Sequence, residues 1–301
     1  MLSKRDEEIL QAVHFYRYVT AQDVAHLFFS ERVITRVREI LNVLAGGDDD
    51  VSGQYLYRFR LPDTEVGNKR KVFTLGSRGR EFLEEQLGLP ADWYFRPDKV
   101  KHLSFNFVAH SLFLTRVLVA ARTWAATQAD FRLVETRISY ELAKAPAAVR
   151  IPVAGKAVTV SVIPDAWLLF EKLENGAHAH FFPVLLEIDR GTEYQQRFKQ
   201  HIQARIAFIR SGAYRQIFGQ QAVVVAYATT GDKDRPDYLR QRLASMRAWT
   251  NQVLADLNRP NWARVFRFCA LSMDEVYGTP LFSEPVWFRP DEPDPVKLFE
   301  A

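Results

Sequence analysis

The sequence predicts an α+β protein with two domains. Residues 5–90 show apolar residues at helical spacing and then two short alternating runs, whereas residues 105–271 alternate between strand and helix patterns. The length of 301 residues also exceeds what one hydrophobic core usually reaches. We expect a first domain at 1–90, a linker at 91–100 and a second domain at 101–278. A proline-rich tail with little regular structure should follow at 279–301.

The first domain should begin with three helices. Apolar residues recur at helical spacing from Ile9, and Thr20 is placed to cap a short second helix. A third helix is expected from residue 31 to 44, because its apolar residues recur every three or four positions. Gly46 and Gly47 should end this helix.

Two alternating runs, residues 55–59 and 70–75, follow the three helices and predict a hairpin with a long polar tip. Three helices and a hairpin are the order of a winged helix-turn-helix, in which the third helix enters the major groove and the wing contacts the backbone. Double-stranded DNA is therefore the expected partner; a winged helix that contacts protein is the alternative. The expected DNA contacts are Arg32, Thr35 and Arg36 on the third helix, and Asn68, Lys69, Arg70 and Lys71 on the wing.

The second domain should be a mixed sheet with helices packed on its faces, as the order of its elements indicates. A helix is expected at 105–126 and a strand at 131–138. The next elements are a strand at 157–162 that runs into 165–170, a strand at 181–188 and a helix at 192–211. A strand at 222–228, a helix at 237–257 and a strand at 264–271 complete the order.

The composition excludes several classes of protein. The single cysteine, Cys269, rules out an internal disulfide and a cysteine-based zinc site. No glycine-rich phosphate loop or serine elbow is present, which argues against an NTPase and an acyl hydrolase. We expect a cytoplasmic protein without a membrane segment, because no apolar run approaches the roughly 18 residues of a membrane span. The formal net charge of +4 allows a nucleic-acid partner without requiring one.

Three carboxylates form the strongest candidate for chemistry. Asp165 precedes one strand pattern, and Glu187 and Asp189 lie two residues apart on the next, so both should project from one face. A turn near Gly176 should bring the two strands together as antiparallel neighbours. Three converging carboxylates would suit Mg²⁺ or Mn²⁺, which would polarise a phosphodiester and activate a water. A structural network of ion pairs is the alternative.

The second domain resembles the PD-(D/E)xK nuclease superfamily. Pro164-Asp165 matches the first element of that motif and Glu187 the second, whereas Asp189 stands where the family has lysine. An aspartate cannot supply the positive charge that the lysine gives. Two alternatives stay open: Arg190, or Arg197, Lys199 or Arg205 of the following helix, supplies the charge, or the charge is missing.

Residues 5 to 215 also resemble the replication-relaxation family of plasmids and mobile elements. The residues that carry this resemblance are Thr20 to Leu27 (Thr-Ala-Gln-Asp-Val-Ala-His-Leu), Phe73 to Gly79, Pro164-Asp165 and the block Glu187 to Thr192 (Glu-Ile-Asp-Arg-Gly-Thr). The resemblance implies an accessory role in plasmid replication and DNA relaxation, with replication or mobilisation proteins as further partners. It also implies Glu135 as an additional acid and Arg205 as the basic residue of the site.

Three hypotheses follow. The chain is a DNA-binding protein of the replication-relaxation type with a degenerate nuclease-like site, an active Mg²⁺-dependent DNA endonuclease, or a winged-helix transcriptional regulator. In the endonuclease, Asp165, Glu187 and Asp189 would be metal ligands and Arg190 or Arg205 would stabilise charge. Whether the chain forms a homodimer stays open.

Overall fold

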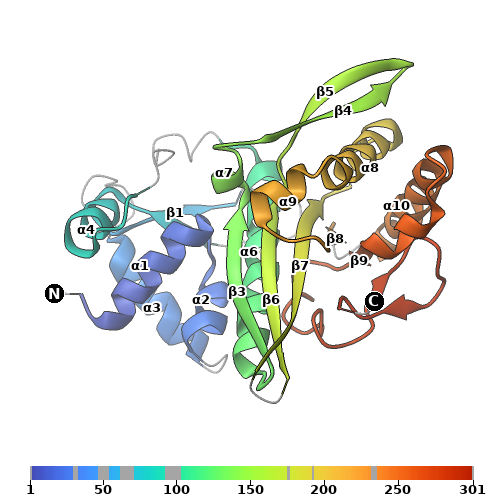
Figure 1. Ribbon diagram of the computed structural model, residues 1–301. Helices are drawn as coiled ribbons and strands as arrows, with labels where there is room; N and C mark the ends of the chain where they lie inside the picture. The colour runs from blue at the N-terminus through green and yellow to red at the C-terminus, as the bar shows by residue number, and fades with distance from the viewer. Residues whose placement is uncertain are drawn as a thin grey trace. The chain divides into compact units, whose positions relative to one another are not determined.

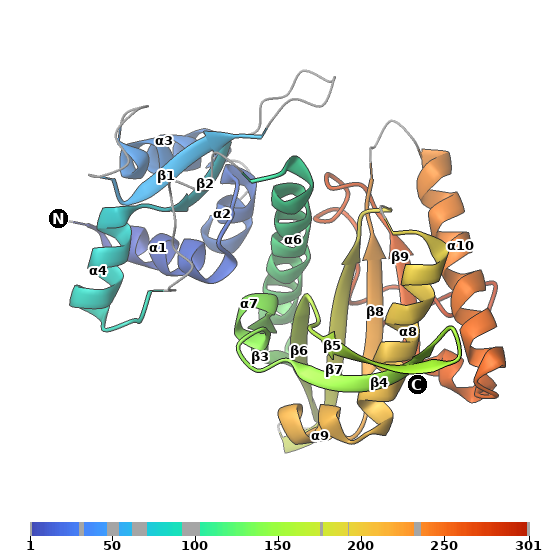
Figure 2. The ribbon, with the colours of Figure 1, turned by 90° about the horizontal axis from the view of Figure 1, so that it is seen from above.

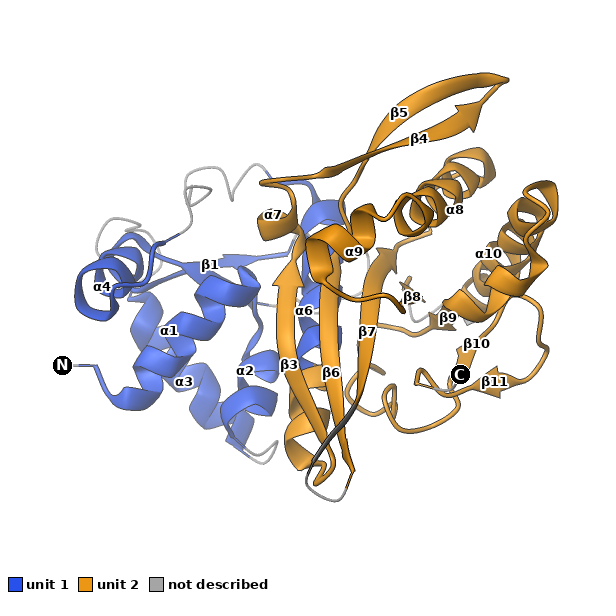
Figure 3. Cartoon of the chain, viewed as in Figure 1, with its two compact units in different colours: residues 1–119 blue, residues 120–301 orange. Residues whose placement is uncertain are grey.

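The computed structural model describes residues 2–29, 33–46, 54–61, 71–91, 103–174, 177–191, 193–231 and 236–299 (Figure 1). The chain divides into two compact units, residues 1–119 and 120–301 (Figure 3). The α+β class is confirmed, because N-terminal helices precede a large mixed sheet. The predicted linker lies almost wholly outside the described residues, and the division falls within helix α6 (Phe105–Thr127).

The first unit has the order of a winged helix-turn-helix. Its elements are α1 (Lys4–Tyr16), α2 (Ala21–Phe28), α3 (Ile34–Ala45), β1 (Leu56–Arg60), β2 (Lys71–Leu75) and α4 (Ser77–Leu87). Strands β1 and β2 form an antiparallel hairpin, and Val19 adds a bridge to Phe73. The three helices therefore precede a small sheet, as the sequence predicts.

A capping box starts helix α2. The Thr20 hydroxyl accepts from the backbone of Asp23 at 3.4 Å, and the Asp23 carboxylate accepts from the backbone of Thr20 at 2.6 Å. The fully buried Asp23 also forms an ion pair with Arg116 of α6 at 3.5 Å. The Thr-Ala-x-x-Val motif thus begins with a helix cap that is tied to a second helix of the same unit.

The second unit is built on a seven-stranded sheet with the order β11-β10-β9-β8-β7-β6-β3. Strands β7, β8 and β9 are parallel to one another, and the remaining pairs are antiparallel. The strands are β3 (Phe131–Ile138), β6 (Ala166–Glu174), β7 (Ala177–Asp189), β8 (Val224–Thr229), β9 (Phe266–Ala270), β10 (Trp287–Phe288) and β11 (Pro295–Val296).

Helices cover one face of this sheet. Helices α8 (Gln195–Arg210), α9 (Ala213–Phe218) and α10 (Pro236–Asp256) lie in the connections between β7, β8 and β9, with a 3₁₀ turn at Pro260–Val265. Figure 2 shows α8 and α10 on the same side of the strands. Trp167, Phe198 and Tyr227 belong to the buried core between these helices and the sheet. None of the described helices is long and apolar enough to cross a membrane.

Two parts of the second unit differ from the sequence prediction. The expected strand at 157–162 does not run into 165–170, because β5 (Lys156–Val162) pairs with β4 (Ala147–Val153) in a separate hairpin that follows the short helix α7 (Ser139–Leu142). The proline-rich residues 279–301 contribute β10 and β11 to the sheet edge. Trp287 and Leu298 of this segment are each 1% exposed, so the segment packs as part of the core.

Candidate functional site

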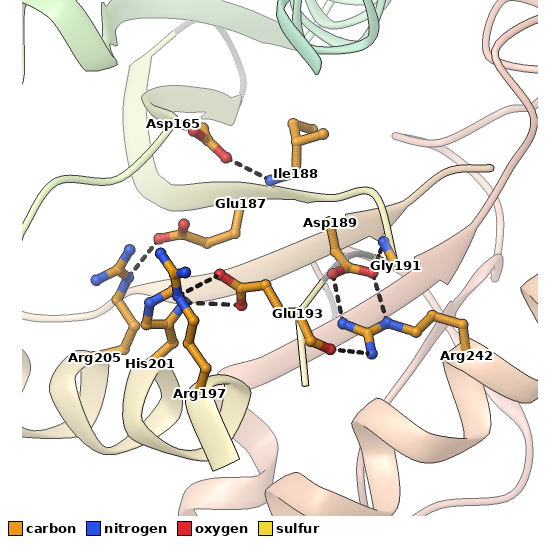
Figure 4. A network of polar contacts seen from close by, with 10 residues as sticks. All are labelled: Asp165, Glu187, Ile188, Asp189, Gly191, Glu193, Arg197, His201, Arg205 and Arg242. Atoms are coloured by element: carbon orange, nitrogen blue, oxygen red, sulfur yellow. Dashed lines mark hydrogen bonds and ion pairs between the residues drawn. The ribbon is translucent and has the colours of Figure 1, made fainter. Parts of the chain in front are cut away.

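The predicted carboxylates lie at the carboxyl end of β7, beside the start of β6. The antiparallel register pairs Ala166 with Leu186, so Asp165 lies close to the Glu187 end of β7, as predicted. Asp165 Oδ2 accepts a hydrogen bond of 2.7 Å from the backbone amide of Ile188 (Figure 4). This carboxylate therefore extends the pairing of the two strands beyond the last backbone pair.

Glu187 forms a buried ion pair with Arg205 of helix α8. Arg205 Nε donates to Glu187 Oε1 at 2.5 Å, and the two residues are 6% and 8% exposed. Burial raises the pKa of the Glu187 carboxyl above its usual value, although the charge of Arg205 acts in the opposite direction. Burial alone would lower the pKa of Arg205, but Glu187 more than offsets this effect and raises it. The predicted acid and the predicted basic residue thus meet.

Asp189 is occupied by a second buried arginine, Arg242 of helix α10. Arg242 Nη2 donates to Asp189 Oδ1 at 2.7 Å, and Arg242 Nε donates to Oδ2 at 2.9 Å. Asp189 Oδ2 also accepts from Thr229 Oγ1 at 2.7 Å and from the Gly191 amide at 3.0 Å. The side chains of Arg242 and Asp189 are only 7% and 5% exposed. Asp189 is therefore held in a bidentate pair with Arg242.

Helix α10 also holds the turn that follows Asp189. Arg242 Nη1 donates to the carbonyl oxygen of Glu193 at 2.9 Å, and Tyr238 Oη donates to that of Gly191 at 3.0 Å. Gly191 has a φ of +70°, and a Cβ at this position would lie 2.0 Å from Tyr238 Oη. Glycine suits the left-handed backbone here, and a side chain would displace the Tyr238 hydroxyl from its bond to Gly191.

Two further basic residues on α8 bind Glu193. Arg197 Nε lies 3.5 Å from Glu193 Oε1, and His201 Nδ1 lies 3.1 Å from Oε2. Arg197, His201 and Arg205 follow one another at helical spacing and point toward the acids in Figure 4. The acidic end of β7 is thus matched by bases from two helices.

The other two predicted residues lie differently. Glu135 is on the edge strand β3, and its carboxylate accepts from Arg137 Nε of the same strand at 2.6 Å. Arg190 follows Asp189, is partly buried, and has a pKa that burial lowers. Figure 4 draws neither Glu135 nor Arg190.

Two of the three carboxylates are paired with arginine in this arrangement. Within the described ranges, no three His, Cys, Asp or Glu side chains are placed to hold a metal. Both oxygens of Asp189 are bonded to Arg242, and one oxygen of Glu187 is bonded to Arg205. Asp189 would have to release the guanidinium before it could act as a ligand. The predicted Mg²⁺ or Mn²⁺ site therefore stays a prediction.

Some predicted DNA contacts lie on exposed surface of the first unit. Thr35 and Arg36 are exposed on α3, and Arg36 forms a solvent-exposed pair of 3.0 Å with Glu39. Lys71 is exposed at the start of β2, directly across from the exposed Arg60. Arg32, Asn68, Lys69 and Arg70 lie outside the described residues.

Comparison with known proteins identifies the family. The sequence model of the replication-relaxation family matches residues 10–224, more than half of the chain. The chain belongs to the replication-relaxation family. No curated protein and no solved structure matches this replication-relaxation protein.

In this replication-relaxation protein, three side chains contact the segment Glu187 to Gly191. Arg205 binds Glu187, Arg242 binds Asp189, and Tyr238 binds the Gly191 carbonyl oxygen. Sequence reasoning missed Arg242, because it lies 53 residues after Asp189 on a helix that carries no motif. It also missed Tyr227, which pairs with Glu187 in the β7–β8 register and is 4% exposed. Burial raises the pKa of Tyr227 well above its usual value, so its phenol stays neutral. The one sequence signal for Tyr227 is that side chains alternate between the two faces of a strand, which puts residue 227 on the same face of β8 as residue 225.

Proposed function

We propose that this chain is a DNA-binding accessory protein of plasmid replication and relaxation. In this proposal the winged helix binds duplex DNA, and the acids of β7 serve to fix α8 and α10 rather than to cleave DNA. Family membership indicates the replication-related role. The DNA contact and the absence of cleavage are the parts that need testing.

One observation carries the DNA-binding proposal. Arg60 and Lys71 are exposed and directly opposite each other at the end of the β1–β2 hairpin. Like charges at directly opposed positions destabilise a strand pair, and a bound phosphate would relieve that repulsion. Thr35 and Arg36 are exposed on the helix that a winged helix-turn-helix places in the major groove.

The test measures how DNA binding depends on salt. Fluorescence anisotropy with a labelled duplex would compare the wild type with Lys69→Gln/Arg70→Gln/Lys71→Gln over a NaCl series. The slope of log K against log salt should flatten by about 0.9 for each phosphate that these side chains neutralise, up to about three units. The matched control, Arg122→Gln/Arg240→Gln/Arg259→Gln, removes three exposed charges of the second unit and should leave the slope unchanged. Equal slopes in the wild type and the wing variant would reject the wing as a DNA contact.

An active endonuclease is the second candidate, because Asp165 lies beside Glu187 at the ends of two paired strands. Wild-type protein incubated with supercoiled plasmid and Mg²⁺ or Mn²⁺ should bind the plasmid and leave it supercoiled. Nicking that disappears in Asp165→Asn would overturn the non-cleaving proposal. Thermal unfolding of this variant controls for loss of the Asp165–Ile188 hydrogen bond.

A further inference from the structure

The β4–β5 hairpin is an appendage of the second unit that the seven-stranded sheet does not include. Its two strands pair only with each other among the described strands. One face carries Ala147, Val149 and Ile151, which are buried in the core cluster with α8. Figure 1 shows the hairpin running past α8, away from the sheet. Its opposite face is left to solvent.

The charged side chains of residues 143–164, which include the hairpin, are all positive. Lys144, Arg150 and Lys156 are exposed, and no aspartate or glutamate occurs from residue 143 to residue 164. None of these three side chains forms an ion pair within the part of the chain that the structure describes. This contrasts with Arg197, Arg205 and Arg242, which pair with Glu193, Glu187 and Asp189.

The outer face of the hairpin also carries small and polar side chains. Arg150 lies directly across from Thr159, and Ala148 lies across from Ser161. All four side chains are exposed. Hydroxyl and guanidinium donors are the groups that proteins use on phosphate oxygens, and small neighbours leave room for the backbone of a nucleic acid. A two-stranded ribbon is also narrow enough to follow a DNA groove.

We propose that the β4–β5 hairpin is a second contact for duplex DNA. Arg150 on its outer face, Lys144 just before β4 and Lys156 at the hairpin tip, on the side of Val153, would each lie against a phosphate. This inference rests on the proposed DNA-binding function and adds a site in the other unit. Charge complementarity favours DNA over an uncharged or basic partner. The three cations attract the phosphates of DNA, whereas an uncharged partner gives no such attraction and a basic partner would repel them.

The experiment uses the full-length chain and a labelled duplex of about 30 base pairs, roughly three helical turns of about 10 base pairs each. Lys144→Gln/Arg150→Gln/Lys156→Gln should weaken binding several-fold near physiological salt. Its salt slope should flatten by about 0.9 for each phosphate that these side chains neutralise, up to about three units. The control Arg122→Gln/Arg240→Gln/Arg259→Gln removes the same charge and should retain the wild-type slope. The reversal Arg150→Glu is an independent check and should weaken binding more than Arg150→Gln.

The outcomes separate the two proposals. If the wild type does not bind duplex DNA, both the proposed function and the hairpin contact are rejected. If the wild type binds and the hairpin variant keeps the wild-type slope, only the hairpin contact is rejected. If the variant has a flatter slope on a single-stranded oligonucleotide and not on the duplex, the assignment to duplex DNA is wrong. Matching circular dichroism spectra of the variants would confirm that weaker binding does not reflect unfolding.

Discussion

At the scale of single residues, the two acids of β7 are centres of ion pairs. Glu187 binds Arg205 of α8, and Asp189 binds Arg242 of α10. Each pair joins β7 to a different helix. Such pairs contribute little net stability compared with apolar packing, but removal of one partner leaves a buried charge without compensation. The sequence analysis matched Asp189 to the position of a nuclease lysine, and in the structure Asp189 pairs with Arg242.

Loss of Arg242 should therefore destabilise the second unit strongly. We expect Arg242→Met to lower the free energy of unfolding by about 3–5 kcal/mol, because Asp189 stays buried without its guanidinium. Arg240→Met on the same helix is the control, since its pair with Asp237 is mostly exposed and should be worth less than about 1 kcal/mol. Urea unfolding measures both values. Similar losses in the two variants would contradict the role of the Asp189–Arg242 pair. Asp189→Asn combined with Arg242→Met should recover part of the stability that Arg242→Met loses.

At the scale of elements, the sequence predicted the helices and strands whose ranges depend on local patterns of apolar residues. Strand β3 and the helices α6, α8 and α10 fall within a few residues of their predicted ranges, because apolar periodicity is a local property. Strand β4 was missed, and Pro152 is one reason, since proline usually argues against a strand interior. The partner of Asp189 was also missed, because the pairing of β7 with α10 depends on the parallel crossover and not on local sequence.

The turn after β7 gives a prediction about glycine. Gly191→Ala should destabilise by more than the roughly 1 kcal/mol that a left-handed alanine costs, because its Cβ would also collide with Tyr238. Gly212→Ala is the matched control, since Gly212 has a φ of +81° and nothing within 4 Å of the added Cβ. Thermal or urea unfolding gives the difference between the two variants. Tyr238→Ala should reduce the cost of Gly191→Ala to that of Gly212→Ala; an unchanged cost would mean that the collision is not the cause.

At the scale of the whole molecule, the C-terminal segment closes the second face of the sheet. Phe282 and Phe299 of this segment lie 5.6 and 5.0 Å from the ring of Phe170 on β6. Trp124 at the end of α6 stacks on the same two rings. The prolines at 280, 285, 290, 293 and 295 suggested a tail without regular structure, but prolines exclude only long paired strands and not close packing. The composition of residues 279–301 does not show which of their aromatic side chains pack in the core.

Trp287 tests whether this segment is part of the core. Its ring is 1% exposed, and its Nε1 donates to the carbonyl oxygen of Leu281 at 2.7 Å. Trp287→Ala should lower the free energy of unfolding by about 3–5 kcal/mol through the cavity that it leaves. Trp287→Phe keeps most of the packing and should cost less, about 1–3 kcal/mol for the unsatisfied carbonyl together with the smaller ring. The exposed Phe181, at 48%, provides the control, because Phe181→Ala should change stability only slightly. In urea unfolding, Trp287→Ala should lose the most stability, Trp287→Phe less and Phe181→Ala the least. If Trp287→Ala is as stable as Phe181→Ala, the segment packs against the sheet without stabilising it.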